Sequence, residues 1–161
     1  MGVANDVTPS SWKRIRQRGK EKGMSKRDTY HDVVKQALIQ EGWTITHDPY
    51  SFDADPQLST DLGAERLIAA EKHASKIAVE IKSFLHESQV GELEKAAGQY
   101  RLYLRLLAIQ EPERTMVLAV PIHAFENIFR RQVGQLAIDE FELNLVVYSL
   151  TPGEALRWNP K

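Results

Sequence analysis

Two charged side chains interrupt an apolar stretch of the chain, Ile77-Ala78-Val79-Glu80-Ile81-Lys82-Ser83-Phe84. Alternation along a β-strand turns residues 78, 80 and 82 to one face and residues 77, 79 and 81 to the other. Glu80 and Lys82 therefore share a face, opposite the larger apolar side chains. Charged groups avoid burial unless they are paired or bound to something. The stretch predicts a strand that carries a functional site or, alternatively, a solvated face with a cross-strand ion pair.

A second carboxylate lies upstream of this strand. Asp61 precedes Glu80 by 19 residues and stands at the end of a second predicted strand, which we expect to neighbour the first. Mg²⁺ takes a few carboxylate oxygens and keeps several waters, so Asp61, Glu80 and the backbone carbonyl of Ile81 would form part of its shell, with Mn²⁺ as a substitute. Lys82 beside that metal would orient or deprotonate an attacking water and offset charge on phosphorus. This is the chemistry of phosphodiester hydrolysis.

The flanking sequence predicts an α/β (α+β) fold with a mixed central sheet flanked by helices. Helical periodicity is found at 30–41, where Asp28 or Thr29 would cap the helix and Gly42 end it, at 87–110 and at 122–142, with a break at Gly134. Strands are expected at 43–47, 58–62, 66–71, 76–84, 115–120, 143–150 and 155–158, with a polar loop after the first.

Composition limits the number of domains and the kinds of site. The 161 residues suffice for one core of ordinary size and not for two, so we expect a single domain over residues 27–161. The chain has no cysteine, which excludes disulfides, zinc–thiolate sites and cysteine nucleophiles. No apolar run approaches the roughly 20 residues that cross a bilayer, and no signal peptide is recognisable. We therefore expect a cytoplasmic protein without membrane contact.

The first 26 residues differ in charge from the rest. Eight basic residues and one acid lie between Lys13 and Arg27, although the net charge of the chain is −1. Clustered basic residues suggest phosphate contact, because binding releases counterions. The segment also lacks apolar periodicity and precedes an alternative start at Met24. We expect residues 1–26 to be a disordered or misassigned extension.

The arrangement Asp61…Glu80-x-Lys82, with a helix before it and a long helix after it, resembles the PD-(D/E)XK nuclease superfamily and its restriction-endonuclease-like fold. The resemblance implies a DNA substrate, a Mg²⁺ cofactor and catalytic roles for these three residues. Thr60 stands where many members carry a proline, which is dispensable in the superfamily.

Three further sets of residues bear on this resemblance. Gln99 and Tyr103 match the Gln-x-x-x-Tyr motif of the RecB-like branch, which supports the active site and DNA contact; the alternative is that Tyr103 belongs to the core. Asp32 occupies roughly the place of an additional acidic metal ligand, with simple helix-start electrostatics as the alternative. Glu65 would extend the acidic cluster if the chain turns after Gly63.

A closer resemblance, to the XisH family, extends from Tyr30 to Trp158. XisH proteins are the fdxN element excision controlling factors of cyanobacteria. The segments that carry the resemblance are Tyr30-His31-Asp32-Val33-Val34-Lys35, residues 42–49, Asp61-Leu62-Gly63-Ala64-Glu65, residues 67–72, residues 78–84 and Leu118-Ala119-Val120-Pro121. The resemblance implies an accessory role in removing a DNA element, together with a site-specific recombinase and a small partner, XisI.

Three functions remain open at this level. The first is a DNA-associated XisH protein with a Mg²⁺-dependent endonuclease site that acts in element excision. The second is a non-catalytic accessory protein that binds a XisI-type partner or a recombinase. The third is a nuclease toxin that a XisI-like partner neutralises. A homodimer is a further expectation, since nucleases of this superfamily often pair to cut both strands.

Overall fold

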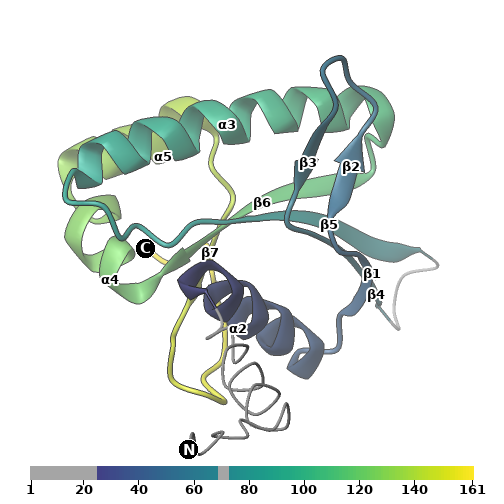
Figure 1. The fold of residues 1–161 in the computed structure, drawn as a ribbon, viewed down its shortest axis with the longest axis horizontal. Coiled ribbons are helices and arrows are strands. Elements are labelled where there is room, and N and C mark those ends of the chain that lie inside the picture. The colour runs from purple at the N-terminus through teal and green to yellow at the C-terminus, as the bar shows by residue number, and fades with distance from the viewer. Residues whose placement is uncertain (1–24, 69–72) are drawn as a thin grey trace, which may run out of the picture.

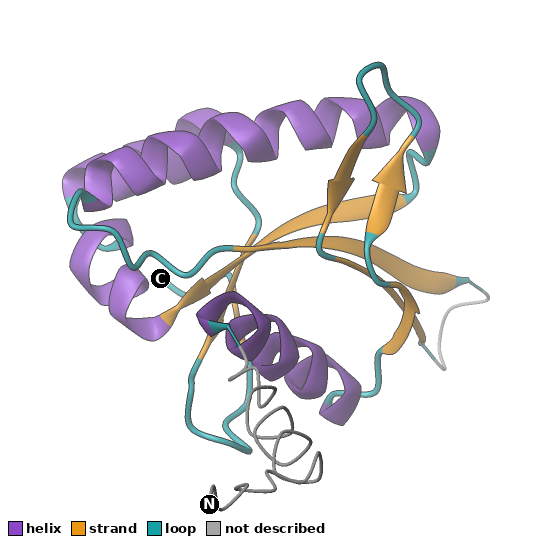
Figure 2. Ribbon diagram, in the orientation of Figure 1, coloured by secondary structure: helices purple, strands orange, loops and turns teal. Residues whose placement is uncertain are grey.

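A computed structural model describes residues 25–68 and 73–161. The predicted basic extension, residues 1–26, lies almost entirely outside these ranges. The described residues form a six-stranded mixed sheet in the order β1-β4-β5-β6-β7-β8. Helix α2 (Lys26–Gln40) lies on one face, and helices α3 (Gln89–Gln110) and α5 (Gln132–Phe141) lie on the other (Figures 1 and 2). This confirms the predicted fold class. The strands of this sheet are β1 (Thr44–His47), β4 (Leu62–Leu67), β5 (Ala74–Ile81), β6 (Arg114–Pro121), β7 (Leu145–Tyr148) and β8 (Arg157–Trp158).

The centre of the sheet is parallel and its edges are antiparallel. Strand β5 pairs in parallel with β6, and β6 with β7, whereas β1, β4 and β8 run antiparallel to their neighbours. The long helix α3 (Gln89–Gln110) makes the crossover from β5 to β6, as parallel strands require. Strand β5 thus lies inside the sheet, with α3 starting a few residues beyond its carboxyl end.

Helix α2 (Lys26–Gln40) begins earlier than the sequence predicted. Ser25 is its N-cap, and its hydroxyl accepts a hydrogen bond from the Asp28 amide at 3.2 Å while the Asp28 carboxylate accepts one from the Ser25 amide. The predicted cap at Asp28 or Thr29 is therefore wrong, because Asp28 is the third residue of a capping box. Gly42, at a φ of 88°, follows the end of the helix as predicted.

A small second sheet follows β1: its first strand lies in the segment predicted as a polar loop, and its second lies in the predicted strand 58–62, which ends at Thr60. Strands β2 (Tyr50–Phe52) and β3 (Leu58–Thr60) pair antiparallel; β2 contacts α3, and β3 contacts β5. Phe52 packs on Tyr103 with ring centroids 4.8 Å apart. The prolines of this segment fall outside both strands, so they do not prevent the hairpin. The chain then bends at Asp61 before it enters β4.

The predicted helix 122–142 is divided into helix α4 (Ile122–Ala124), a π-helical turn (Phe125–Phe129) and helix α5 (Gln132–Phe141). The break lies at residues 130–131, not at Gly134. Gly134 lies inside α5, where a Cβ atom would stand 2.1 Å from the carbonyl oxygen of Ile128. Its role is close helix packing, which explains why the prediction of a break there was wrong.

Two apolar cores lie on the two faces of the sheet. Strand β6 contributes to both, because Val117 and Ala119 face α2 whereas Met116 and Leu118 face α3. No helix in the described ranges is long and apolar enough to span a membrane.

Candidate active site

The register of the sheet brings Asp61 beside the carboxyl end of β5. Leu62, the first residue of β4, pairs with Val79. Asp61 precedes Leu62 and therefore lies beside Glu80 and Ile81, which follow Val79. Its Oδ2 accepts a hydrogen bond from the Ile81 amide at 2.7 Å. Asp61 is thus close to the Glu80 strand as predicted, although the predicted strand 58–62 is divided at Asp61 and β4, not β3, pairs with β5. One carboxylate oxygen of Asp61 is fixed by the backbone.

Glu80 is almost fully buried and is held at both oxygens. Its exposed fraction is 6%. Oε2 accepts a hydrogen bond from the Thr60 hydroxyl at 2.6 Å, and Oε1 lies 3.2 Å from the Lys82 ammonium. The charged pair predicted on one strand face is present, but it stands on a partly buried wall and not on a solvated one.

The charge on Glu80 is opposed by its surroundings. Burial raises the pKa of this carboxyl group, and the neighbouring charge of Asp61 raises it further, whereas the Thr60 hydroxyl and Lys82 lower it. The raising causes prevail, so the pKa lies above its ordinary value. A cation placed between the two carboxylates would remove the repulsion that Lys82 leaves uncompensated.

The backbone that carries Lys82 is fixed on both sides. The Lys82 amide donates to the carbonyl of Ala119 at 2.9 Å, and the Lys82 carbonyl accepts from the Tyr148 hydroxyl at 2.8 Å. Two residues later Phe84 adopts a φ of 52°, in the left-handed region that non-glycine residues rarely visit. Its carbonyl accepts from Gln89 at 3.1 Å. Such backbone conformations persist where surrounding contacts enforce them, as at active sites.

Asp61, Glu80 and Lys82 line one cavity of about 640 Å³ between the amino-terminal ends of α2 and α3. Its wall combines acids with cations from several elements. Arg27 and His31 come from α2, and Lys95 comes from α3. The full lining consists of Arg27, Tyr30, His31, Asp61, Glu80, Ile81, Lys82, Ser83, Leu85, His86, Glu92, Lys95 and Gln99. A polyanion could therefore meet positive charge on opposite walls.

The Gln-x-x-x-Tyr pair lies at the same place. Gln99 lines the cavity and donates to the Tyr103 hydroxyl at 2.7 Å. Burial first, and then the charges of Glu80 and Asp61, raise the pKa of Tyr103, while Gln99 lowers it. Lys95 was missed by the sequence analysis. Its spacing from Gln99 could have indicated it, because residues 95 and 99 are one helical turn apart and share a helix face.

Asp32 and Glu65 lie away from this cavity. Asp32 is exposed and lines a separate hollow with Ser149 and Glu154. Its neighbour His31 faces the cavity, and each residue of a helix is rotated by about 100° from the one before, so Asp32 points elsewhere. Glu65 pairs across the sheet with Lys76 and binds Arg114 at 3.1 Å. The turn after Gly63 on which its prediction depended is replaced by the continuous strand β4. The site described here contains neither residue.

The donor set fits an open magnesium site. In the described ranges no group of three or more histidine, aspartate or glutamate side chains could by itself hold a metal ion. The cavity offers the carboxylates of Asp61 and Glu80, together with the backbone at Ile81. Mg²⁺ is commonly bound through one or two carboxylates, waters and substrate phosphate oxygens. The residues therefore suit a metal that arrives with phosphate and water, and not a closed cage.

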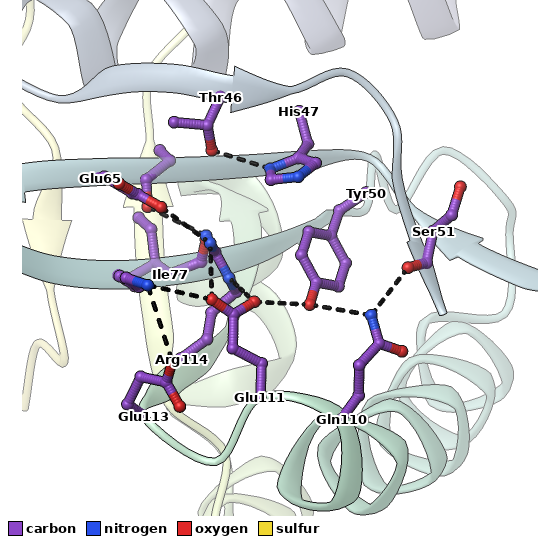
Figure 3. A network of polar contacts seen from close by, with 12 residues as sticks. Thr46, His47, Tyr50, Ser51, Glu65, Ile77, Gln110, Glu111, Glu113 and Arg114 are labelled. Atoms are coloured by element: carbon purple, nitrogen blue, oxygen red, sulfur yellow. Dashed lines mark hydrogen bonds and ion pairs between the residues drawn. The ribbon is translucent and has the colours of Figure 1, made fainter. Parts of the chain in front are cut away.

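Figure 3 shows a second polar cluster, at the other end of β5. Its member Lys76 is on the same face of the strand as Glu80, because strand side chains alternate. Arg114 is the centre of the cluster, with a side chain 1% exposed that binds Glu111 at 2.7 Å, Glu65 at 3.1 Å and the carbonyl of Ile77 at 3.0 Å. Its members, called the Arg114 network below, are Tyr50, Glu65, Lys76, Gln110, Glu111 and Arg114.

The Arg114 network satisfies its own charges. Hydrogen bonds from Arg114 first, and then from Tyr50 and Lys76, outweigh burial and lower the pKa of Glu111 to about 2. Burial and the neighbouring Glu111 raise the pKa of Tyr50 to about 12. The network thus keeps a carboxylate ionised and a phenol protonated over the physiological range, as a structural ion cluster does.

Comparison with known proteins identifies the family. The model of the XisH protein family matches residues 24–155. The chain belongs to the XisH family. One similar solved structure is the crystal structure of an XisH family protein from Nostoc punctiforme PCC 73102, with 34% sequence identity and a TM-score of 0.71. The match covers 81% of this chain and 98% of that chain. The crystal structure of a fdxN element excision controlling factor protein from Anabaena variabilis has the same identity and TM-score, and the match covers 83% of this chain and 100% of that chain. No functionally curated protein matches significantly.

Proposed function

We propose that this XisH protein is a Mg²⁺-dependent phosphodiesterase of the PD-(D/E)XK type that cuts DNA during element excision. The observation that carries the proposal is the convergence of Asp61, Glu80 and Lys82 in one cavity, with Lys82 3.2 Å from Glu80. Ion pairs that serve only stability tend to be satisfied, as in the Arg114 network. Here the pKa of the buried carboxylate is raised, which is typical of functional sites.

Each residue has a distinct role in this proposal. Asp61, Glu80 and the backbone carbonyl of Ile81 would hold the metal. When bound, Mg²⁺ polarises the phosphate and stabilises the leaving oxygen. Lys82, anchored through its backbone to Ala119, would orient the attacking water and offset charge on the phosphoryl oxygens.

Other lining residues would position the DNA. Arg27, whose side chain is 89% exposed and lies 3.8 Å from the Asp61 carboxylate, and Lys95 on the opposite wall would contact phosphates on either side of the scissile one. Gln99 presents its amide at the wall, where its hydrogen bond to Tyr103 fixes its orientation. Such contacts set the register of the strand without reading its sequence.

A second function, protein binding, is favoured by an apolar groove between α3 and α5. The groove encloses about 340 Å³. Val90, Val133 and Leu136 on its wall are 44%, 49% and 60% exposed. Exposed apolar surfaces of this kind mark protein contacts. A non-catalytic accessory protein, or a toxin neutralised by its partner, would bind a XisI-like protein or a recombinase here, and a homodimer would use the same face.

The test is cleavage of supercoiled, linear and branched DNA with Mg²⁺ or Mn²⁺. The parent is compared with Asp61→Ala, Glu80→Ala and Lys82→Ala, and with Asp139→Ala, an exposed control on α5. The proposal expects cleavage by the parent and the control and a loss of at least about a hundredfold in the three site variants. Equal cleavage by all proteins, or none by the parent even with a XisI-like partner, would favour the accessory function.

A further inference from the structure

We infer that Thr60 is a positioning residue whose hydroxyl group holds the Glu80 carboxylate so that Oε1 faces Lys82 and the cavity. The inference deepens the proposed function: its expectation for metal affinity rests on that function, whereas its expectation for the position of the carboxylate does not. Thr60 is 2% exposed. In the described part of the chain, the only other buried polar or charged residues are Glu80 and Arg114. A hydroxyl group is buried at this position because it has a specific partner.

The geometry shows which partner it serves. The Thr60 Oγ1 lies 2.6 Å from Glu80 Oε2 and 3.0 Å from the carbonyl oxygen of Val79. A hydroxyl group has one proton, so it donates to one of the two acceptors. The shorter distance falls in the range of O–H···O⁻ hydrogen bonds, which are about twice as strong as neutral ones. The carboxylate is therefore the acceptor, and Val79 is a secondary contact.

Thr60 is also the most rigid of the groups around Glu80. It is the last residue of β3, and its β-branched side chain has restricted χ1 freedom. The other contact of Glu80 is the end of the Lys82 side chain, which is 26% exposed and long. The nearby charge of Asp61 repels the carboxylate. Without the hydroxyl group, nothing rigid would keep Glu80 in its present orientation against that repulsion.

This contact gives the small β2–β3 sheet a role in the site. The hairpin delivers Thr60 to Glu80 and then Asp61 to the Ile81 amide, so consecutive residues hold the two carboxylates from one bend of the chain. Substitution of residues that orient metal ligands without touching the metal commonly lowers metal affinity about 10–100-fold. We expect an effect of about this size on removal of the Thr60 hydroxyl group.

The experiment compares Thr60→Val, which keeps the shape and removes the hydroxyl group, with Thr60→Ser, which retains it. Val146→Ala, a buried substitution on the α2 side of the sheet, controls for general loss of stability. Crystal structures without metal are expected to show the Glu80 carboxylate rotated away in Thr60→Val and unchanged in Thr60→Ser. Mn²⁺ affinity, measured by electron paramagnetic resonance, should fall about tenfold in Thr60→Val only.

The inference is overturned if Glu80 keeps its position in Thr60→Val, or if Val146→Ala weakens Mn²⁺ binding as much. If the parent binds no Mn²⁺, the proposed function fails, whereas the crystal structures still decide the positioning role. Thr60→Ala serves as the replacement if Thr60→Val does not fold, with the same expected displacement and the same rescue by serine.

Discussion

Strand β5 carries two ionic clusters on one face, and they behave in opposite ways. Lys76 belongs to the Arg114 network near its start, while Glu80 lies in the candidate site near its end. The pKa of Glu111 is lowered to about 2, whereas the pKa of Glu80 is raised. At Glu111 the hydrogen bond from Arg114 outweighs burial, whereas at Glu80 burial, and then the charge of Asp61, outweighs Thr60 and Lys82. A buried acid left undercompensated is expected where a ligand completes the site.

The largest expected effect is loss of the Arg114 network. Arg114→Leu leaves Glu111 and Glu65 without their buried partner and removes the hydrogen bond to the carbonyl of Ile77. Breaking a buried ion cluster costs about 3–5 kcal/mol of unfolding free energy. Urea unfolding measures this value. Arg130→Leu, which breaks an exposed pair with Glu126, should cost less than about 1 kcal/mol, and similar losses in both variants would contradict the comparison.

A smaller effect of opposite sign is expected for Glu80→Gln. Because the folded pKa of Glu80 is raised, the native state retains a proton that the unfolded state has lost, once pH exceeds the ordinary value of 4.5. The stability of the parent therefore falls as pH rises through that window. Glu80→Gln has no such dependence and should be more stable than the parent at pH 8. Unfolding curves from pH 5 to 8 check this; a less stable variant at pH 8 would mean that Lys82 fully compensates the charge.

Glu111→Gln should show the reverse pH dependence. The lowered pKa of Glu111 contributes stability that is present above 4.5 and is lost as pH falls towards about 2. The parent should therefore lose stability on acidification more steeply than the variant. Thermal unfolding between pH 5 and 2 measures both slopes. Parallel curves would show that Arg114 does not stabilise the ionised form.

The smallest effect is expected at the edge of the cavity. Lys95→Ala removes one phosphate contact, so DNA affinity should fall a few-fold and the slope of log K against log salt should decrease by about one. Arg101→Ala, on the same helix but paired with Glu142 away from the cavity, provides the control. A greater change in slope for Arg101→Ala would place the DNA on another surface.

The sequence predicted the sheet, the long crossover helix and the neighbourhood of Asp61 and Glu80, because alternation and helical periodicity report which face each side chain takes. It predicted a strand at 58–62 but not β2 or its pairing with β3, since Pro49 and Pro56 suggested a loop although both lie outside the strands. Asp32 and Glu65 were assigned from their positions along the chain. Their directions depend on helix rotation and on Arg114, which only the folded structure shows.

The most direct test of the central claim is the stabilisation that Mn²⁺ or Mg²⁺ gives to the folded protein. At a hundred times the dissociation constant, binding should raise the unfolding free energy of the parent by about 2.7 kcal/mol. The account predicts this gain in the parent and in Glu111→Gln, and its absence in Asp61→Asn and Glu80→Gln. No gain in the parent, or an equal gain in all four proteins, would contradict a metal site at the end of β5.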